Sequence, residues 1–520
     1  MELLIQFICL LLVGILAIYL LLLKRFSYWA DRGVVHEKPV FYYGNMQGVG
    51  SKYAILKPIR DFYTKFKGQA PFGGFYLSLR LAALLLDLEL IKAVMIKDFN
   101  NFAHRGNYYN ERDDPLSAHL LNLDGPKWRR LRAKLTPTFS SGKMKLMLPS
   151  LVEVGEKLIN VVAKQVAKQL TESGIELKEL LARFTTDVIG TCAFGLQCNS
   201  LNDPNTQFLR MGQLALSRPR RKRILIPLMQ AFPKLARKLR MRLVEQDVHN
   251  FFMGVVRQTV EYREREHIKR NDFMNILLEL KQNNETEGLT LEEIAAQAFV
   301  FFLAGFETSS STMSFCLYLL ALHPEIQQRA RAEINAALER HKGIFTYECI
   351  RELKYLQQII RETLRMYSIA TILVRKTLED YPVPNSKHII EKGTIVLIPI
   401  DAIHHDPDIY PDPEVFDPER FTPAAIESRS SVSWLAFGDG PRNCIGMRFG
   451  EMQTMVGLAM LLKNFTFSRA PLTQIPLEID PKSFLLSSKA VCVELITNVK
   501  IYINNSFESL ARAINKQRWC

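Results

Sequence analysis

The sequence predicts a mainly α-helical protein with a small β region, attached to a membrane by an N-terminal anchor. Three observations predict this class. Apolar residues recur with the helical period over several long stretches, strand-like runs are few and short, and the N-terminus holds an apolar segment of membrane-spanning length. The 520 residues contain no internal repeat and no low-complexity linker, so we expect one large globular unit behind the anchor.

The first expected element is the anchor, an apolar segment from Leu3 to Leu23 interrupted only by Gln6. At about 1.5 Å per residue a helix of this length crosses a hydrocarbon layer of about 30 Å. Its acidic start at Glu2, its length and the lack of a small-residue cleavage site argue against a secretory signal peptide. Lys24 and Arg25 follow at once, so the positive-inside rule places the remaining chain in the cytosol.

The rest of the chain is expected to be helical with short interruptions. Helical periodicity covers Leu148–Gln169, Leu177–Phe194, Val244–Arg265, Leu291–Leu322, Pro324–Arg340 and Gln357–Met366. Strand-like runs are Gly74–Leu79, Ala82–Leu86 and Thr394–Ile398. The segment Asp401–Pro423 is rich in Pro and Asp and predicts an ordered meander. We divide the chain into an anchor at residues 1–24, a globular domain at 25–498 and a tail at 499–520 to which no role is assigned.

The chain is basic, with 67 Lys and Arg against 53 Asp and Glu and a formal net charge of +14. Nucleic-acid binding is one interpretation, and Arg218–Arg223 resembles a nuclear-localisation run. A membrane-anchored chain instead favours anionic lipid or an acidic protein partner, so no nucleic acid is expected. The apolar stretch Ile224–Phe232 follows the basic run directly, which is an interfacial pattern, with a solvated face over a core as the alternative. The eight scattered cysteines are interpreted as free thiols of a cytosolic body.

The most informative stretch is the glycine-rich loop 437–446, Phe-Gly-Asp-Gly-Pro-Arg-Asn-Cys-Ile-Gly. Gly438 and Gly440 can adopt positive φ and let the backbone approach a flat ligand closely. Cys444 precedes a run of good helix formers, so it is expected near a helix N-terminus, where the thiolate is favoured. No Cys or His lies within four residues of Cys444, which gives a four-ligand zinc site no local support. A buried structural cysteine in a glycine-rich loop is the alternative.

The order Phe-x-x-Gly-x-Arg-x-Cys-x-Gly resembles the haem-binding signature of the cytochromes P450. The resemblance implies a mainly α triangular-prism fold and a haem b, iron protoporphyrin IX, in a haem-thiolate catalytic domain. Cys444 would be the axial ligand of the haem iron, which such enzymes hold by a thiolate. Arg442 would bind a haem propionate, and Phe437 and Gly446 would contact the cofactor.

Two further places resemble propionate-binding positions of the same family. Trp128 and Arg132 stand at i and i+4 and share a helix face, and both can donate to a carboxylate. They match the family's Trp-x-x-x-Arg, although a basic face with one anchoring Trp is an equally good explanation. Arg375, at the end of an apolar run, matches a further propionate-binding position, with a surface arginine as the alternative.

The long stretch from Leu291 contains a candidate catalytic motif. Thr290 and Glu293 form a capping box that fixes the helix start. Inside the helix, Thr308 can compete for the carbonyl four residues back and so permits a local opening of the helix. The stretch resembles the family's oxygen-activation motif, in which Glu307 and Thr308 would relay protons to dioxygen. The alternative is a helix with a packing glycine and a surface Glu.

A structural set is expected at Glu362 and Arg365, which stand at i and i+3 on one helix. They resemble the family's Glu-x-x-Arg, and by the same match Arg420 bridges Glu362 to make a buried network that braces the meander. The family usually has Pro three residues after the helix arginine, and here that position is Ser368. We therefore expect a different local backbone beside the pocket.

The resemblance, closest to microsomal, insect-type members, implies a monooxygenase that inserts one atom of O₂ into a lipophilic substrate such as a xenobiotic, an insecticide-like compound, a hormone or a fatty acid. Electrons would come from NADPH through NADPH–cytochrome P450 reductase, with cytochrome b5 as a second candidate donor, at the endoplasmic reticulum membrane. The expected pocket wall comprises Phe102–Leu123, Phe208–Ala236, Phe301 and Phe302, Ile369–Val374 and Ser483–Ser488. Two alternatives stay open: a haem-thiolate isomerase or dehydratase that needs no O₂, and a non-catalytic membrane haem- or sterol-binding protein.

Overall fold

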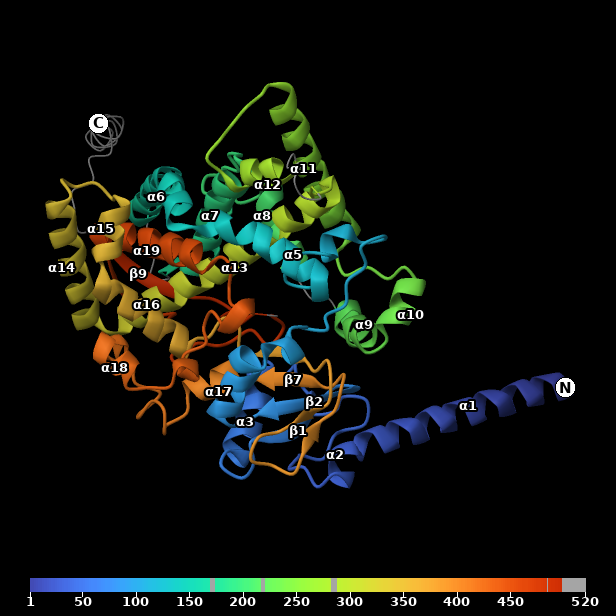
Figure 1. Cartoon of the computed structure of the whole chain (residues 1–520). Helices are drawn as coiled ribbons and strands as arrows, with labels where there is room; N and C mark the ends of the chain where they lie inside the picture. The colour runs from blue at the N-terminus through green and yellow to red at the C-terminus, as the bar shows by residue number, and fades with distance from the viewer. Residues whose placement is uncertain (169–173, 217–219, 282–287, 484, 498–520) are drawn as a thin grey trace, which may run out of the picture.

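The computed structural model describes residues 1–168, 174–216, 220–281, 288–483 and 485–497. It consists of a mainly helical body and one long helix, α1 (Glu2–Phe26), that projects away from it (Figure 1). None of the most apolar part of α1 is buried in the body, and its mean hydropathy of 2.8 suits a membrane span. It is the single helix in the described part of the chain that is long and apolar enough to cross a bilayer. The body thus leaves α1 free to insert in lipid.

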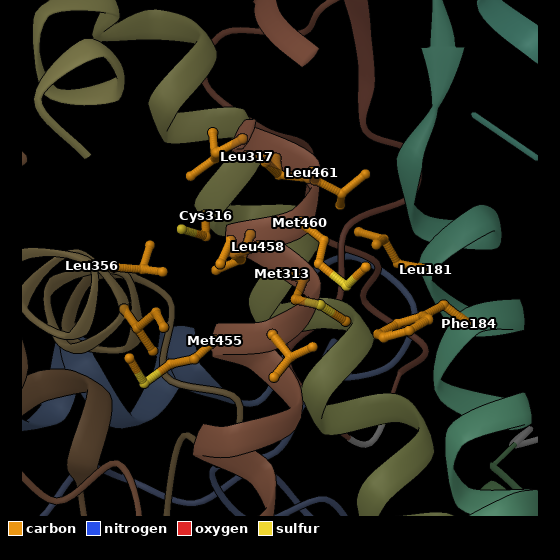
Figure 2. Close-up of a cluster of buried hydrophobic side chains, with 14 of the residues drawn as sticks. Leu181, Phe184, Met313, Cys316, Leu317, Leu356, Met455, Leu458, Met460 and Leu461 are labelled. Atoms are coloured by element: carbon orange, nitrogen blue, oxygen red, sulfur yellow. The ribbon is translucent and has the colours of Figure 1, made fainter. Parts of the chain in front are cut away.

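The helical core is built around α13 (Leu291–Leu322), which is apolar on all sides and therefore buried along most of its length. Against it pack α7 (Leu177–Ile189), α16 (Lys354–Met366) and α19 (Met447–Asn464). Figure 2 shows the centre of this core, where Phe184 of α7, Met313 of α13 and Met460 of α19 lie side by side. This packing fixes α13 relative to α19, which are the two helices that bound the candidate site.

The other helices surround this core. Those before α13 are α2 (Tyr28–Asp31), α3 (Leu56–Phe66), α4 (Leu88–Lys92), α5 (Gly125–Leu135), α6 (Ser141–Lys168), α8 (Gln207–Leu216), α9 (Arg220–Ala231), α10 (Pro233–Lys238), α11 (Gln246–Arg265) and α12 (Phe273–Lys281). Those after it are α14 (Pro324–Arg340), α15 (Tyr347–Glu352), α17 (Ile400–His404) and α18 (Pro423–Glu427).

A four-stranded sheet forms the small β region, in the order β1-β2-β7-β4. The strands β1 (Phe72–Leu77) and β2 (Arg80–Leu85) form an antiparallel hairpin, β7 (Ile395–Ile398) joins β2 in parallel, and β4 (Leu373–Lys376) is antiparallel to β7. Gly73 and Gly74 are required in β1, because a Cβ there would meet the rings of Phe62 and Trp29 at 2.5 and 2.2 Å. The sheet therefore packs tightly on α3 and on the segment that follows the anchor.

Two smaller sheets complete the fold. One has the order β3-β9-β8, from Ile175–Glu176, Cys492–Thr497 and Phe465–Arg469, and the other pairs β5 (Tyr381–Pro382) with β6 (Ile389–Ile390). The predicted fold class, mainly α with a small β region behind an apolar N-terminal helix, is confirmed.

The boundaries of single elements agree to different degrees. Helices α13 and α14 have the predicted limits, whereas α6 begins seven residues earlier than predicted, at Ser141. The predicted meander Asp401–Pro423 contains most of the short helix α17 and a 3₁₀ turn at Pro418–Phe421, and it ends where α18 begins. The division at residues 24 and 498 stays a prediction, although α1 runs on to Phe26. The tail 499–520 lies outside the described residues.

Candidate active site

The candidate site is a cavity of about 1160 Å³, including its open mouth, between α13, α5 and the start of α19. Its wall is mainly apolar, and the side chains that matter below include Trp128, Phe301, Thr308, Phe437, Cys444 and Phe449. The thiol of Cys444 and the hydroxyl-bearing Thr308 thus line the same space, although 136 positions separate them in the chain. A reactive sulfur and a hydroxyl come together in an apolar surrounding.

The loop that carries Cys444 is held by its backbone. Gly438 and Gly440 both have φ of +68°, as the sequence predicts, and the carboxylate of Asp439 accepts from the Gly440 amide at 2.6 Å. The Cys444 amide donates to the Phe437 carbonyl at 2.8 Å and closes the loop. Helix α19 then begins at Met447, three residues after the cysteine. The sulfur is therefore fixed beside the helix N-terminus.

The electrostatics of Cys444 combine opposing effects. Burial, the largest effect, raises the pKa of the thiol, while the Gly446 amide and the cations of Arg132 and Arg105 lower it. The Gly446 amide and the two cations act in the direction that the sequence predicts, and the prediction that the thiolate is the favoured form stays a prediction. A metal cation at the sulfur reverses this balance, since coordinating thiols are deprotonated.

Arg442 lies in the wall of the cavity and is 3% exposed. Its Nη2 donates to the Leu123 carbonyl at 2.8 Å and to Asp124 Oδ1 at 2.9 Å, and its guanidinium stacks over the Trp128 ring at 4.1 Å. Its Nη1, by contrast, is buried and has no partner among the described residues. The Nη1 group of Arg442 therefore remains available to donate a hydrogen bond to a ligand.

Arg375 is also buried with one side-chain donor that has no partner in the described part of the chain. It is 1% exposed, and its Nη1 donates only to the neighbouring Val374 carbonyl, at 3.0 Å. Its Nε is buried without a partner in the described part of the chain. Burial and the nearby Arg105 and Arg442 lower the pKa of Arg375 to about 9. A buried, repelled cation with a free donor indicates an acidic ligand, since buried charges are normally paired. The alternative of a surface arginine is wrong.

Sequence reasoning missed Arg105, which lies in the cavity wall close to Arg132 and Cys444. Its Nη1 donates to the Leu121 carbonyl at 3.0 Å, and burial lowers its pKa to about 10. The available signal was a basic residue inside Phe102–Leu123, a segment expected to line the pocket. Arg132 differs from the prediction, because both of its terminal nitrogens donate to Asn443, at 3.0 and 2.6 Å. It holds the cysteine loop directly.

The charges and donors around the cavity fit a haem. The cluster of Arg105, Arg132, Arg375 and Arg442 carries more positive charge than its one hydrogen-bonded carboxylate, Asp124, can balance, and it contains two buried donors without partners in the described chain. Two propionates supply that missing negative charge. No group of three or more His, Cys, Asp or Glu side chains suited to a metal occurs among the residues that the structure describes. One cysteine, a largely apolar cavity and the cationic rim formed by Arg105, Arg132, Arg375 and Arg442 fit a haem.

On α13, Thr308 and Glu307 do not face the same space. Thr308 lines the cavity, and its Oγ1 donates to the Ala304 carbonyl at 2.5 Å, as predicted. Glu307 lines a second, more polar cavity of about 1350 Å³ between α7, α8 and Asp480–Lys489. Its Oε1 accepts from Ser487 at 3.2 Å and from Ser311 at 3.5 Å. The two motif residues therefore connect two different cavities across one helix.

The structural set is assembled as expected. Arg365 donates to both carboxylate oxygens of Glu362, at 2.7 and 2.8 Å, and both side chains are fully buried. Arg420 Nε lies 3.5 Å from Glu362 Oε1, and the Asp417 amide donates to the same oxygen at 3.0 Å. Burial raises the pKa of Glu362, and the pairing with Arg365 opposes that rise. The network ties α16 to the meander.

Ser368 adds a connection that the sequence did not predict. The Leu435 amide donates to His404 Nε2 at 2.9 Å, so the ring proton must lie on Nδ1, which contacts Ser368 Oγ at 2.7 Å. The serine in turn donates to the Leu364 carbonyl at 3.0 Å. This buried relay connects α16 to the residue two positions before Phe437, at the start of the cysteine loop.

The pocket wall was predicted only in part. Leu120, Leu121 and Phe301 line the cavity, but Phe302 is buried in an aromatic cluster with Phe208 and Phe252. The described parts of Phe208–Ala236 and Ile369–Val374 do not line the cavity of Cys444, and Gln213, Leu216, Ser483 and Leu485 line the second cavity instead. Phe208, Phe252 and Phe302 pack on one another and therefore do not line this cavity.

The comparisons with known proteins agree with this geometry. Residues 36–495 match the family model described as cytochrome P450. Cytochrome P450 6a2 of Drosophila melanogaster is 51% identical over 475 residues, covering 89% of this chain and 94% of the relative. Cytochrome P450 6A1 of Musca domestica is 49% identical over 486 residues, covering 92% and 95%. Probable cytochrome P450 6a13 of Drosophila melanogaster is 50% identical over 477 residues, with the same coverage of 92% and 95%.

Proposed function

Because this chain belongs to the cytochrome P450 family and is a haem-thiolate monooxygenase, we propose that it inserts one oxygen atom of O₂ into a lipophilic substrate, with electrons delivered from NADPH by a flavoprotein reductase. The observation that carries the proposal is the common cavity of Cys444 and Thr308. Haem, when bound, supplies the iron at which dioxygen is activated. The other oxygen atom leaves as water.

The residues of the cysteine loop and the cationic rim hold the cofactor in this proposal. Cys444 provides the thiolate ligand of the iron, and Arg442, Arg375 and Arg105 receive the propionates. Trp128, stacked under Arg442, supports the rim. Phe437 and Gly446 lie in the cavity wall, where they would contact the porphyrin, and Arg132 keeps the loop in place through Asn443.

Proton delivery is assigned to α13. Thr308 presents its hydroxyl to the cavity, and its bond to the Ala304 carbonyl fixes the direction of that hydroxyl. Glu307 faces the second cavity, whose wall also carries Lys178, Lys482 and Lys489. We propose that Glu307 takes up a proton from solvent in the second cavity and passes it towards Thr308, the next residue of the continuous helix α13. Ser487 donates to the Glu307 carboxylate and holds it at the second cavity, where the proposed proton path begins.

The substrate class follows from the cavity wall. Phe139, Ile189, Phe273, Val300 and Phe301 line it, and its exposed area is largely apolar. Such a wall favours lipophilic molecules, because burial of apolar surface is the available driving force. We propose xenobiotics, insecticide-like compounds, hormones or fatty acids as candidates. Water-soluble, strongly charged substrates are disfavoured.

The proposed location is the endoplasmic reticulum membrane, with the body in the cytosol. Helix α1 provides the anchor, and α10 with the residue that follows it adds exposed Leu235 and Leu239 beside Lys234 and Lys238. In Figure 1, α9 and α10 lie on the flank of the body towards which α1 extends. Apolar side chains between lysines suit the interface of an anionic membrane. The net charge of +14 suits the acidic reductase proposed as partner, with cytochrome b5 as a second donor.

The test is a reconstitution of the purified holoprotein with reductase in phospholipid vesicles, supplied with NADPH and isotopically labelled dioxygen. The expected result is one labelled oxygen atom in the product of a lipophilic substrate. Thr308→Ala serves as the comparison, because it should keep the haem and the ligand but divert reducing equivalents to peroxide. Unlabelled product, or rearranged product formed without NADPH, would contradict the proposed oxygen insertion.

A further inference from the structure

Asp124 lies directly before α5 and joins three groups of the cationic rim. Its Oδ1 accepts from the Arg105 amide and its Oδ2 from the Gly106 amide, both at 2.9 Å. The same Oδ1 accepts from Arg442 Nη2 at 2.9 Å. The carboxylate is 15% exposed and the arginine 1%, so this pair is shielded from solvent. One side chain therefore holds the backbone beside Arg105 and the guanidinium of Arg442.

The charge around Asp124 is strongly one-sided. Four guanidinium groups surround the rim, and among the described residues Asp124 is the one carboxylate that is hydrogen-bonded to them. The remaining acceptors for Arg105, Arg132 and Arg375 are carbonyl and amide oxygens. The two propionates of a haem and the thiolate of Cys444 would bring the net charge of this cluster close to zero. Removing Asp124 leaves a surplus positive charge next to the cofactor.

We infer that Asp124 is a positioning residue for the haem, which orients Arg442 and Arg105 towards the propionates and sets the charge balance on which the reduction potential depends. The inference rests on the proposed haem binding. It extends that proposal, because Asp124 does not itself line the cavity and lies behind two residues that do, Arg105 and Arg442. It acts through the two arginines and through its charge.

Two substitutions separate the geometric effect from the charge effect. Asp124→Asn keeps the size of the side chain but removes the negative charge, so reduction, which adds an electron, becomes easier and the potential moves to more positive values. Asp124→Glu keeps the charge but moves the acceptor away from Arg442. Loss of one charge-assisted hydrogen bond corresponds to about tenfold faster haem release. The potential of Asp124→Glu should stay near that of the parent.

The measurements are the reduction potential by spectroelectrochemistry and the rate of haem transfer to a haem-free acceptor protein, both on the full-length holoprotein. Asp114→Asn is the matched control, because Asp114 is also buried and accepts from two backbone amides, those of Leu243 and Val244, at 2.8 and 3.2 Å. It is hydrogen-bonded to none of the rim arginines in the described chain. We expect its potential and release rate to match the parent.

Unchanged potential in Asp124→Asn together with unchanged haem release in Asp124→Glu would overturn the inference, while thiolate ligation would stand. If Asp124→Asn folds but is isolated without haem, the holding role is supported. If it fails to fold and Asp124→Glu behaves like the parent, Asp124 serves the fold alone and the inference is wrong. Absence of haem from the parent protein would instead refute the proposed function.

Discussion

Gly440 offers a quantitative test of the cysteine loop. Its φ of +68° places it in the left-handed region, which costs a non-glycine residue roughly 1–2 kcal/mol. A Cβ at this position would lie 2.1 Å from the Met95 carbonyl oxygen and 3.1 Å from the carbonyl carbon. Because these are backbone atoms, either the Met95 segment or the loop must move, and such overpacking costs about 1–3 kcal/mol more. We expect Gly440→Ala to destabilise the holoprotein by about 2–5 kcal/mol.

The matched control lies two residues earlier in the same loop. Gly438 also has φ of +68°, but a Cβ there would meet only Leu373 Cδ1 at 3.4 Å and Asn443 Cα at 3.8 Å, which are ordinary contacts. Gly438→Ala should therefore cost only the backbone term, roughly 1–2 kcal/mol. The difference between the two variants isolates the close approach to Met95.

The assay combines thermal melting of the haem-loaded protein with the fraction that gives the red-shifted carbon-monoxide band after reduction. Gly440→Ala should melt lower than Gly438→Ala and lose more of the band, since displacement of the loop moves Cys444. Equal losses in both variants would refute the reasoning, because they would show that the contact with Met95 plays no part.

Three other outcomes are expected. Ser368→Ala should lower the stability by about 1–3 kcal/mol, because it leaves His404 Nδ1–H buried without an acceptor; a melting temperature equal to the parent's would contradict the relay. Ser487→Ala should leave haem binding intact but increase the peroxide formed per NADPH, because the Glu307 carboxylate loses the Ser487 hydroxyl that donates to it at 3.2 Å. An unchanged ratio of peroxide to NADPH would argue against proton entry at Glu307. Burial lowers the pKa of His119 from 6.5 to about 3. Between these two pH values the unfolded chain binds a proton at His119 and the folded protein does not, so the free energy of unfolding falls as the pH drops below 6.5. The free energy of unfolding should lose about 1.4 kcal/mol per pH unit at this site, and His119→Gln should flatten the acid limb of denaturant midpoints measured against pH.

The helices that bound the site were predictable because their ends carry local signals. The capping box of Thr290 and Glu293 starts α13, and Pro324 is the first residue of α14, so that only His323 separates the two helices. The start of α6 was less predictable, since Ser141–Met147 mixes polar and apolar residues without a clear stop. Pattern reasoning succeeds where a cap or a proline marks the boundary.

Site residues that belong to a contiguous sequence motif were predictable. Residues that reach the site only through the packing of distant segments were less so. The loop 437–446 and its positive φ angles follow from its glycines. The separation of Glu307 from Thr308 follows from helix geometry, because neighbouring residues point about 100° apart, yet the second cavity depends on distant segments. Arg105 entered the rim through tertiary folding of a segment without a motif. The sequence around Arg105 gives no reason to expect Arg105 in the cavity wall rather than the nearby Arg112, which pairs with Asp113 on the surface.

The central claim is that the sulfur of Cys444 binds the haem iron. The most direct measurement is the carbon-monoxide difference spectrum of the reduced, purified protein, compared with that of Cys444→Ser. The account predicts the red-shifted thiolate band in the parent and its loss in the variant. A parent protein that carries no iron when expressed with ample haem, or a variant that retains the band, would contradict it.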